Sequence, residues 1–338
     1  MSEPLLRTEQ LSRHFRVGKL FSRDVLHAVD DVNLTIGRGE IVALVGESGS
    51  GKSTIARLLA RVYKPTGGEI YFEGVSVSRL RTRKQRLAYA SDVPMVFQDP
   101  YSSINPAYRI SHGIRRGLNL HRKDLARKQR GVEVERVLGA VGLVPPRAMS
   151  GKFPHELSGG QRQRVGFAQA LAFRPKLIIA DEPVSMLDVS IRIGVLNLMS
   201  ELRQREGVSF LYITHDIAGA RYIADRVLVM YAGHLVEEGP TEEVIRRPRH
   251  PYTQLLLSAV PDPRAPLAIS DAADVGEPPK VVNPSEGCRF RFRCPLAVDV
   301  CQTVTPPMRQ VGADRFVACH VAEADAEEQA PRLAGVES

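Results

Sequence analysis

The sequence predicts an α/β protein built on a parallel sheet, preceded by antiparallel strands and interrupted by a mainly helical region. Three observations predict this class. A buried-strand pattern at residues 40–45 leads into a glycine-rich turn and then a helix-forming run at 55–61. Further apolar strand patterns, at 176–182 and 209–213, are separated by an amphipathic helical pattern at 191–205. Polar residues follow several of these strands, as expected where ligands bind at the carboxyl ends of parallel strands.

Composition is that of an ordinary globular protein. The chain has 338 residues, 43% hydrophobic and 25% charged, which is enough for one large domain with a smaller appendage. No apolar run approaches the ~18 residues of a membrane-spanning helix. The N-terminus has no secretory pattern, so the cytosol is the expected location. The net charge of +8 permits binding to nucleic acid or to an anionic membrane, but the absence of tryptophan disfavours a base-stacking platform.

The first hundred residues read as strands around the glycine-rich turn. Two alternating runs, around 5–17 and 25–36, predict antiparallel strands. Phe15 lies in the first run, where its ring could stack on a base or simply be a half-buried strand aromatic. Short strands are also predicted at 68–74 and 94–97.

The remainder reads as helices, strands and an irregular end. A basic, helical stretch runs from about 106 to 154, and a solvated helical face explains its charge better than a nucleic-acid surface, because no aromatic residues interleave the cations. A helix is predicted from 157 to about 173, with Ser158 as N-cap. A hairpin at 226–237 and a helix at 241–247 follow. Proline then marks an irregular segment from Pro261 to Pro279.

The glycine-rich turn matches the phosphate-binding pattern G-x-x-x-x-G-K-[ST]. Its glycines let backbone N–H groups turn inward around an anion, and the following helix adds a partial positive charge. The lysine supplies a mobile cation for the terminal phosphates, and the first hydroxyl after it can ligate Mg²⁺. The residues of this stretch are Gly46, Glu47, Ser48, Gly49, Ser50, Gly51, Lys52, Ser53 and Thr54.

Three other strand ends carry polar residues that suit the same chemistry. Asp181 closes an apolar strand, where a carboxylate can hold Mg²⁺. Glu182 follows on the extended chain and should point to the other side, where it suits a base for the attacking water. His215 could donate to the γ-phosphate, although it and Gln98 are weak signals taken alone. Their common placement at strand ends favours one shared site.

Taken together these residues resemble the nucleotide-binding subunit of an ABC transporter, across residues 1 to about 250. The resemblance implies a P-loop ABC ATPase fold, with an antiparallel β subdomain, a RecA-like parallel-sheet core and a helical subdomain at about 100–160. It implies that Phe15 stacks on adenine, and that Gln98 contacts Mg²⁺ and joins Glu182 and His215 in catalysis. It also implies that a head-to-tail partner supplies the signature sequence across the ATP. The motif residues not yet named are Ser158, Gly159, Gly160, Gln161 and Asp188.

Residues 96–106, 181–185 and 250–253 further resemble the oligopeptide/dipeptide importer ATPases, and the second ATPase of such systems in particular. This resemblance implies two integral-membrane permease subunits, a paralogous ATPase as partner and an extracellular or periplasmic substrate-binding protein. It implies a peripheral position at the cytoplasmic face of the membrane, with no nucleic acid bound. Related importers carry nickel or oligosaccharides, so these cargoes stay open. A soluble ABC ATPase acting on nucleic acid or ribosomes, and a subunit that binds ATP without turnover, are the other hypotheses.

Four cysteines gather near the end of the chain: Cys288, Cys294, Cys301 and Cys319. Four thiols in a cytosolic protein suit zinc or an iron–sulfur cluster, but this spacing fits neither common pattern, and four reduced thiols are the alternative. The resemblance places them in an importer-type C-terminal domain, residues 251–321, in which some relatives carry a [4Fe–4S] cluster. Residues 322–338 are acidic and poor in apolar residues, which predicts a disordered tail.

Overall fold

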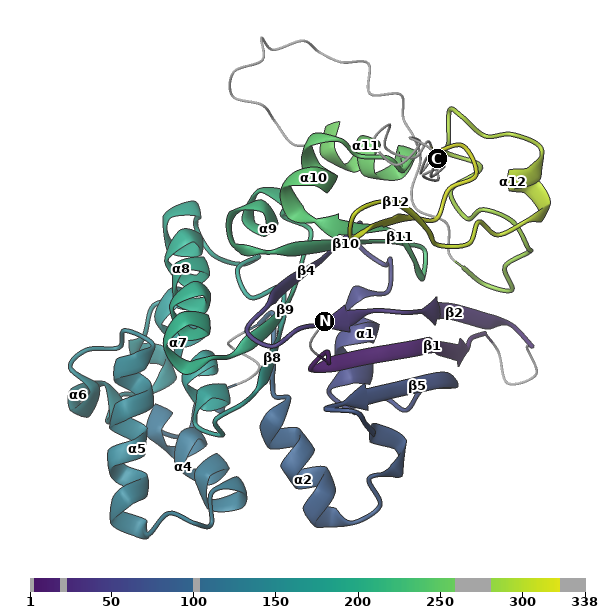
Figure 1. Ribbon diagram of the computed structural model, residues 1–338. Helices are drawn as coiled ribbons and strands as arrows, with labels where there is room; N and C mark the ends of the chain where they lie inside the picture. Colours follow the sequence, from purple (N-terminus) through teal and green to yellow (C-terminus); the bar gives the residue numbers. More distant parts are fainter. Residues whose placement is uncertain (1–2, 19–22, 100–103, 259–280, 323–338) are drawn as a thin grey trace, which may run out of the picture.

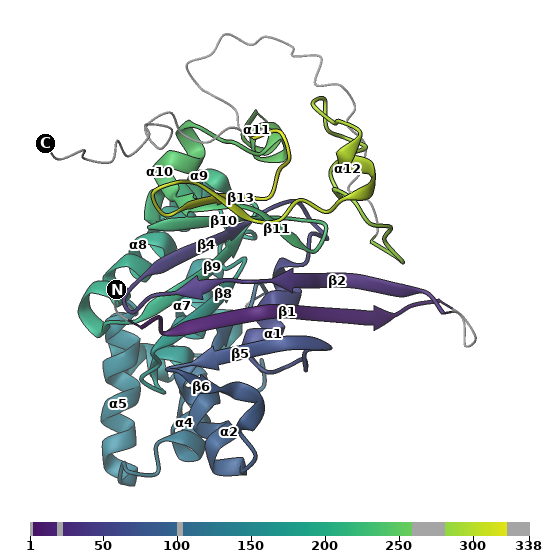
Figure 2. The ribbon, with the colours of Figure 1, turned by 45° about the vertical axis from the view of Figure 1, so that its right-hand side comes forward.

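The computed structural model describes residues 3–18, 23–99, 104–258 and 281–322. These residues form two sheets with helices packed around them (Figure 1). The long strands β1 and β2 lie side by side next to α1, and the helices α4 and α5 lie at the opposite end of the molecule from α12 (Figures 1 and 2). None of the helices in the described residues is both long and apolar enough to cross a bilayer.

The first sheet is the predicted antiparallel one. Within the described residues its order is β2-β1-β5-β6, with β3 paired to β1. Its β1–β2 pair is antiparallel, which confirms the prediction drawn from the two alternating runs. Leu6, Val32 and Ile70 are buried on its inner face, in one apolar cluster with Ile55 of α1. The elements are β1 (Leu6–Arg16), β2 (Val25–Val32), β3 (Thr35–Ile36), β5 (Gly67–Phe72), β6 (Val75–Ser76) and α1 (Lys52–Leu59).

The second sheet is the core. In the described part of the chain its order is β12-β13-β11-β10-β4-β9-β8-β7, and the block β10-β4-β9-β8-β7 is parallel. This confirms the predicted parallel sheet, and the pairing of β10 with β11 confirms the predicted hairpin. The strands are β4 (Ile41–Val45), β7 (Met95–Val96), β8 (Leu177–Asp181), β9 (Ser209–Thr214), β10 (Arg226–Tyr231), β11 (His234–Pro240), β12 (Arg309–Gly312) and β13 (Arg315–Val317).

The central strand β4 is apolar throughout, and its parallel neighbours β9 and β8 are largely so, because both faces of the sheet are covered there. Ile41 and Ala43 of β4 join the apolar cluster that contains α7 (Gly159–Leu171) and α8 (Val189–Glu206). Val42 and Leu44, which alternate with them, join the cluster on the side of α1 and the antiparallel sheet. The central strand is therefore fixed from both sides, and its carboxyl end carries the phosphate loop.

The remaining helices lie at the two ends of the core. Residues of α4 and α5, including Ile114 and Val137, are buried together, while Arg115 and Lys128 are exposed, as expected of a solvated face. Near the C-terminal end of the core, α9 contacts α8 and α10. The elements are α2 (Arg83–Asp92), α4 (Ile110–His121), α5 (Arg127–Ala140), α6 (Pro146–Ser150), α9 (Ile217–Ile223), α10 (Thr241–Arg246), α11 (Pro251–Ser258), α12 (Val300–Thr303) and the 3₁₀ turns Val77–Arg79 and Pro154–Glu156.

The described C-terminal residues extend the core sheet, because β13 pairs with β11. An ion pair between Arg315 Nη2 and Glu237 Oε1, 2.9 Å long, secures this edge, and its side chains are 1% and 0% exposed. The Glu237 carboxylate also accepts the backbone N–H groups of Arg249 and His250. The predicted irregular segment and all but the first residue of the predicted disordered tail lie outside the described residues. The domain boundaries at about 250 and 321 stay a prediction.

Candidate functional site

The phosphate loop joins β4 to α1, and its glycines are required by the backbone. Gly46 has φ 153° and Gly51 has φ 109°. A Cβ atom on Gly46 would lie 2.1 Å from the Met230 carbonyl oxygen, and one on Gly51 would lie 2.2 Å from that of Ala28. Strands β10 and β2 therefore press against the loop so closely that only glycine fits at both positions.

Lys52 folds back across this loop. Its Nζ donates to the carbonyl oxygens of Gly46 at 2.7 Å and Glu47 at 2.8 Å. Burial lowers the pKa of Lys52, and the charges of Glu182, Asp181 and Glu47 oppose that effect. The lysine is thus a partly desolvated cation held at the start of the loop, ready to exchange carbonyl oxygens for phosphate oxygens.

Ser53 and Asp181 bring the start of α1 to the end of β8. Ser53 Oγ donates to Asp181 Oδ1 at 3.1 Å. Burial raises the pKa of Asp181 and the nearby charge of Glu182 adds to this, while the Ser53 hydrogen bond works against it. A hydroxyl and a carboxylate in contact are the oxygen ligands that Mg²⁺ prefers, so the two residues fit the predicted metal site.

Glu182 is joined to two other strand ends. Its Oε2 accepts a hydrogen bond from Gln98 Nε2 at 3.2 Å and lies 3.4 Å from His215 Nδ1. The prediction that Glu182 continues the extended strand is wrong: β8 ends at Asp181, and Glu182 has φ 46°, in the left-handed region. The chain turns there because the Glu182 N–H is bound to the Ile213 carbonyl, while its own carbonyl accepts from Ser185. After this turn, Glu182 contacts Gln98 and His215, while Asp181 contacts Ser53.

Most of these groups surround one hollow of about 730 Å³, whose lining does not include Asp181. Phe15 also lines it, with Tyr63 edge-on at 5.5 Å between ring centroids and the Arg13 guanidinium 4.5 Å from the Phe15 centroid. The sequence reasoning missed Tyr63, although an aromatic residue shortly after the first helix was a visible signal. The predicted residues that line the hollow are Phe15, Ser48, Gly49, Gly51, Lys52, Ser53, Thr54, Gln98, Glu182 and His215.

The predicted signature residues lie elsewhere. Ser158 is the N-cap of α7, as predicted: its Oγ accepts the Gln161 N–H at 3.3 Å, and the Gln161 side chain accepts the Ser158 N–H at 3.1 Å. Ser158 is exposed, and so is Asp188 at the start of α8. Neither residue, nor Gly159, Gly160 or Gln161, lines the hollow of its own chain.

Residues of the C-terminal region bind the phosphate loop, a contact that the sequence did not predict. Arg293 donates from Nη1 to Glu47 Oε2 at 2.9 Å and from Nη2 to Glu47 Oε1 at 3.0 Å. The Glu47 backbone N–H donates to the Tyr252 hydroxyl at 2.8 Å. The side chain and the backbone of one loop residue are therefore both held by residues beyond position 250.

The four cysteines lie in the same C-terminal region without forming a compact set. Cys288 and Cys294 are half-buried, while Cys301 and Cys319 are buried, and all are free thiols. Burial raises the pKa of Cys288 and Cys294, and each also interacts electrostatically with Cys301 and Cys319. Among the described residues no three of these sulfurs lie within 4.8 Å of one another. A tetrahedral zinc site would place them about 3.8 Å apart, so a zinc site is not preformed.

Two family models match the chain. That of the ABC transporter matches residues 29–185, and that of the oligopeptide/dipeptide transporter C-terminal region matches residues 236–301. The "Oligopeptide transport ATP-binding protein AppF" of Bacillus subtilis is 43% identical over 94% of this chain and 98% of its own length. The "Probable peptide ABC transporter ATP-binding protein y4tS" of Sinorhizobium fredii is 44% identical over 95% of this chain and 91% of its own.

Solved structures show the same fold. The dimeric ATP-binding cassette MJ0796, described as a post-hydrolysis state bound to ADP and Pi, is 27% identical and matches with a TM-score of 0.61 over 70% of this chain and 98% of its own. CbiO1 of Clostridium perfringens, part of the transporter complex cbiONQ, is 28% identical and matches with a TM-score of 0.63 over 73% of this chain and 92% of its own.

Proposed function

Because the chain belongs to the ATP-binding subunits of oligopeptide and peptide ABC transporters, we propose that it hydrolyses ATP in the hollow around Lys52 to drive peptide import. The observation that carries this proposal is the meeting of the phosphate loop with the ends of β7, β8 and β9. Gln98, Glu182 and His215 come from these three strand ends and lie around one carboxylate oxygen. Such convergence suits phosphoryl transfer to water, which depends on positioning and charge stabilisation.

In this site the backbone amides of the loop, the start of α1 and Lys52 hold the phosphates. Ser53, Asp181 and Gln98 supply oxygen ligands that would hold Mg²⁺, which neutralises phosphate charge when bound. The ring of Phe15 is proposed to stack on adenine. Its position in the lining of the hollow supports this role, and Tyr63 beside it would extend the apolar surface.

Glu182 is proposed as the residue that accepts a proton from the attacking water. Gln98 and His215 both approach its Oε2, so its carboxylate is fixed in the hollow rather than free to rotate. His215 is 60% exposed at its side chain and can therefore reach a terminal phosphate. The other carboxylate, Asp181, is bonded to Ser53 and serves the metal instead.

A second protomer is proposed to complete the site. Ser158 is exposed at the N-terminus of α7, a position suited to binding an anion. Neither Ser158 nor the next three residues, Gly159, Gly160 and Gln161, line the hollow of their own chain. Asp188 is likewise exposed and available to an interface. The dimeric form of the cassette MJ0796, bound to ADP and Pi, supports this arrangement. The partner is proposed to be a paralogous ATPase subunit.

The complex is proposed to contain two integral-membrane permease subunits and an extracellular or periplasmic substrate-binding protein. The chain would sit peripherally at the cytoplasmic face of the membrane. The match of residues 236–301 to the oligopeptide/dipeptide transporter region supports a peptide cargo over nickel or oligosaccharide. The names of the relatives favour transport over action on nucleic acid or ribosomes.

For the four cysteines, we propose a [4Fe–4S] cluster rather than zinc. Their location in one region, where the Cys288 N–H donates to the Cys301 carbonyl, supports a shared ligand, and their separation disfavours a compact tetrahedral site. Anaerobically purified protein should be brown and contain iron. A colourless, folded and iron-free protein would exclude the cluster.

The test of the catalytic proposal is Glu182→Gln. It should leave ATP binding intact and slow steady-state hydrolysis by at least ~100-fold, because a positioned base contributes 10²–10⁴-fold. The matched control is Glu201→Gln, which changes a glutamate of α8 that pairs with the exposed Arg205. Equal turnover in the Glu182 variant and the control would remove Glu182 from this role.

A further inference from the structure

A cluster of imidazole rings lies on the reverse side of the strands that border the nucleotide hollow. Cross-strand register pairs His14 of β1 with His27 of β2, and Phe15 with Leu26. Phe15 and Leu26 line the hollow, whereas His14 and His27 belong to the opposite face of the two strands. The two imidazoles stack there, with 3.8 Å between ring centroids.

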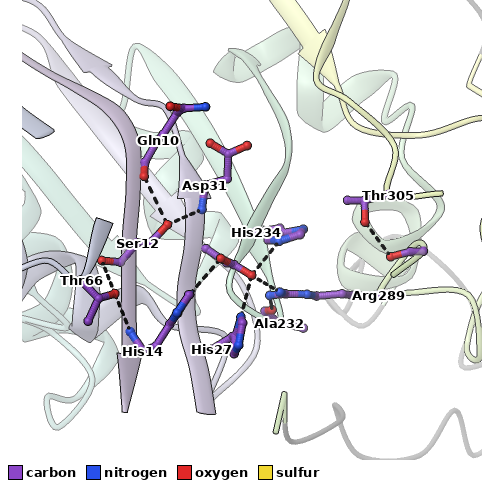
Figure 3. A network of polar contacts seen from close by, with 12 residues as sticks. Gln10, Ser12, His14, His27, Asp31, Thr66, Ala232, His234, Arg289 and Thr305 are labelled. Atoms are coloured by element: carbon purple, nitrogen blue, oxygen red, sulfur yellow. Dashed lines mark hydrogen bonds and ion pairs between the residues drawn. The ribbon is translucent and has the colours of Figure 1, made fainter. Parts of the chain in front are cut away.

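Both rings are directed at a single carboxylate. His14 Nε2 lies 3.0 Å from Asp30 Oδ1, and His27 Nδ1 lies 3.0 Å from Asp30 Oδ2. His234, at the start of β11, brings its Nε2 to 3.7 Å from Oδ2, and Arg289 donates to the same oxygen. Figure 3 shows His14, His27, His234 and Arg289 directed inward toward one point.

Several nitrogens share this one carboxylate. The Arg289 guanidinium and His27 Nδ1 are within hydrogen-bond distance of Oδ2, while His234 Nε2 lies farther away, at 3.7 Å. A neutral imidazole nitrogen that does not carry the ring proton presents a lone pair, and a lone pair beside a carboxylate is what a metal cation requires.

We propose that His14 Nε2, His27 Nδ1 and Asp30 bind a divalent transition-metal ion such as Zn²⁺ or Co²⁺, with His234 as the neighbouring fourth group. One ligand atom from each of the three residues lies within 4.8 Å of the other two, so small side-chain rotations bring them onto one ion. Two imidazoles and a carboxylate suit transition metals better than Mg²⁺ or Ca²⁺. The side chains of His14 and His27 are 29% and 25% exposed, which leaves an entry path.

The surroundings hold the Asp30 carboxylate in place. The Arg289 guanidinium contacts its Oδ2. Arg289 is itself anchored to the Ala232 carbonyl, so it can stay on Oδ2 while Oδ1 turns to an ion. Such a hydrogen bond to a ligating carboxylate orients it.

The site would join three parts of the chain: β1, β2 and, through Asp30 and Arg289, the C-terminal residues. A bound ion would fix the β1–β2 register directly behind Phe15. The ion would bind whether or not the hollow holds ATP.

The test is a Co²⁺ titration of chelator-treated, nucleotide-free protein in excess Mg²⁺, followed by visible absorption and by metal content after gel filtration. Thiolate ligation by the cysteines gives a charge-transfer band that a histidine–carboxylate site lacks, so the two sites are distinguished. We expect the wild-type protein to bind one Co²⁺ without that band. The His14→Gln and His27→Gln variants should each bind Co²⁺ at least ~10-fold more weakly. The matched control, His112→Gln, changes an exposed imidazole on α4 and should bind as wild type.

Wild-type protein provides a reading that needs no variant. Co²⁺ is paramagnetic, so the assigned ring resonances of His14 and His27 should shift at the first equivalent. Co²⁺ bound only with the thiolate band, unshifted His14 and His27 resonances, or unchanged affinity in both histidine variants would overturn the proposal.

Discussion

The contact between Arg293 and Glu47 predicts that the C-terminal residues stabilise the phosphate loop. The pair is bidentate, with N–O distances of 2.9 and 3.0 Å, and its side chains are 12% and 24% exposed. Exposed pairs contribute about 0.2–1 kcal/mol, and loss of one partner of a fully buried pair costs about 3–5 kcal/mol. At this intermediate burial, the coupling free energy between the two side chains should be about 1–2 kcal/mol.

The assay is a double-mutant cycle with Arg293→Met, Glu47→Ala and the double variant. Methionine keeps an aliphatic stem near Tyr231 and Phe290, whose ring centroids lie 5.7 and 5.9 Å from the Arg293 guanidinium. Free energies of unfolding come from urea titrations followed by circular dichroism, because the chain has no tryptophan.

Arg291→Met is the control for this cycle. Arg291 bonds to the Cys288 carbonyl and to Ser285, not to the loop. It should therefore show no coupling with Glu47→Ala. If the free-energy changes of Arg293→Met and Glu47→Ala simply add, within about 0.5 kcal/mol, the proposed grip on the loop is refuted.

Two further predictions concern the packing of the C-terminal residues. Arg315→Met should lower the free energy of unfolding by about 3–5 kcal/mol, because it leaves Glu237 buried without its cation. Urea unfolding measures this change. A loss below about 1 kcal/mol would show that the ion pair is dispensable. Burial lowers the pKa of His250 to about 3, below the unfolded value near 6.5, so the unfolded chain binds the extra proton between these values. The contribution of His250 to the free energy of unfolding should thus be complete above pH 6.5. It should fall by up to about 1.4 kcal/mol per pH unit as the pH drops toward 3. In His250→Asn, the side-chain carbonyl can still accept the Tyr252 N–H, which His250 Nδ1 accepts in the wild-type protein. The free energy of unfolding of this variant should depend less steeply on pH. An unchanged pH dependence would assign it to other groups.

The sequence predicted those parts of the site whose residues follow a recognisable pattern along the chain. A glycine-rich turn between a buried strand and a helix has few alternatives, and the polar residues at strand ends meet because parallel strands share one edge. Phe15 was placed on a strand with two interpretations open, and in the structure it lines the hollow.

The remaining features arise from contacts between residues far apart in the chain, for which no local pattern exists. Arg293 and Glu47 are separated by 246 positions, and Arg289 and Asp30 by 259. The turn at Glu182 depends on a backbone bond to Ile213 on another strand, so the strand pattern alone predicted the wrong conformation. The four cysteines looked like a metal set by count, whereas among the described residues the closest set of ligand atoms belongs to His14, His27 and Asp30.

The central claim is that ATP is held between the phosphate loop of one protomer and the start of α7 of another. Light scattering on the Glu182→Gln protein, whose chain mass is 37.3 kDa, tests it directly. With saturating ATP and Mg²⁺, the mass should double, either alone or with a paralogous ATPase subunit, and Ser158→Arg should abolish the doubling. A protein that binds ATP but stays at the monomer mass in both mixtures would contradict it.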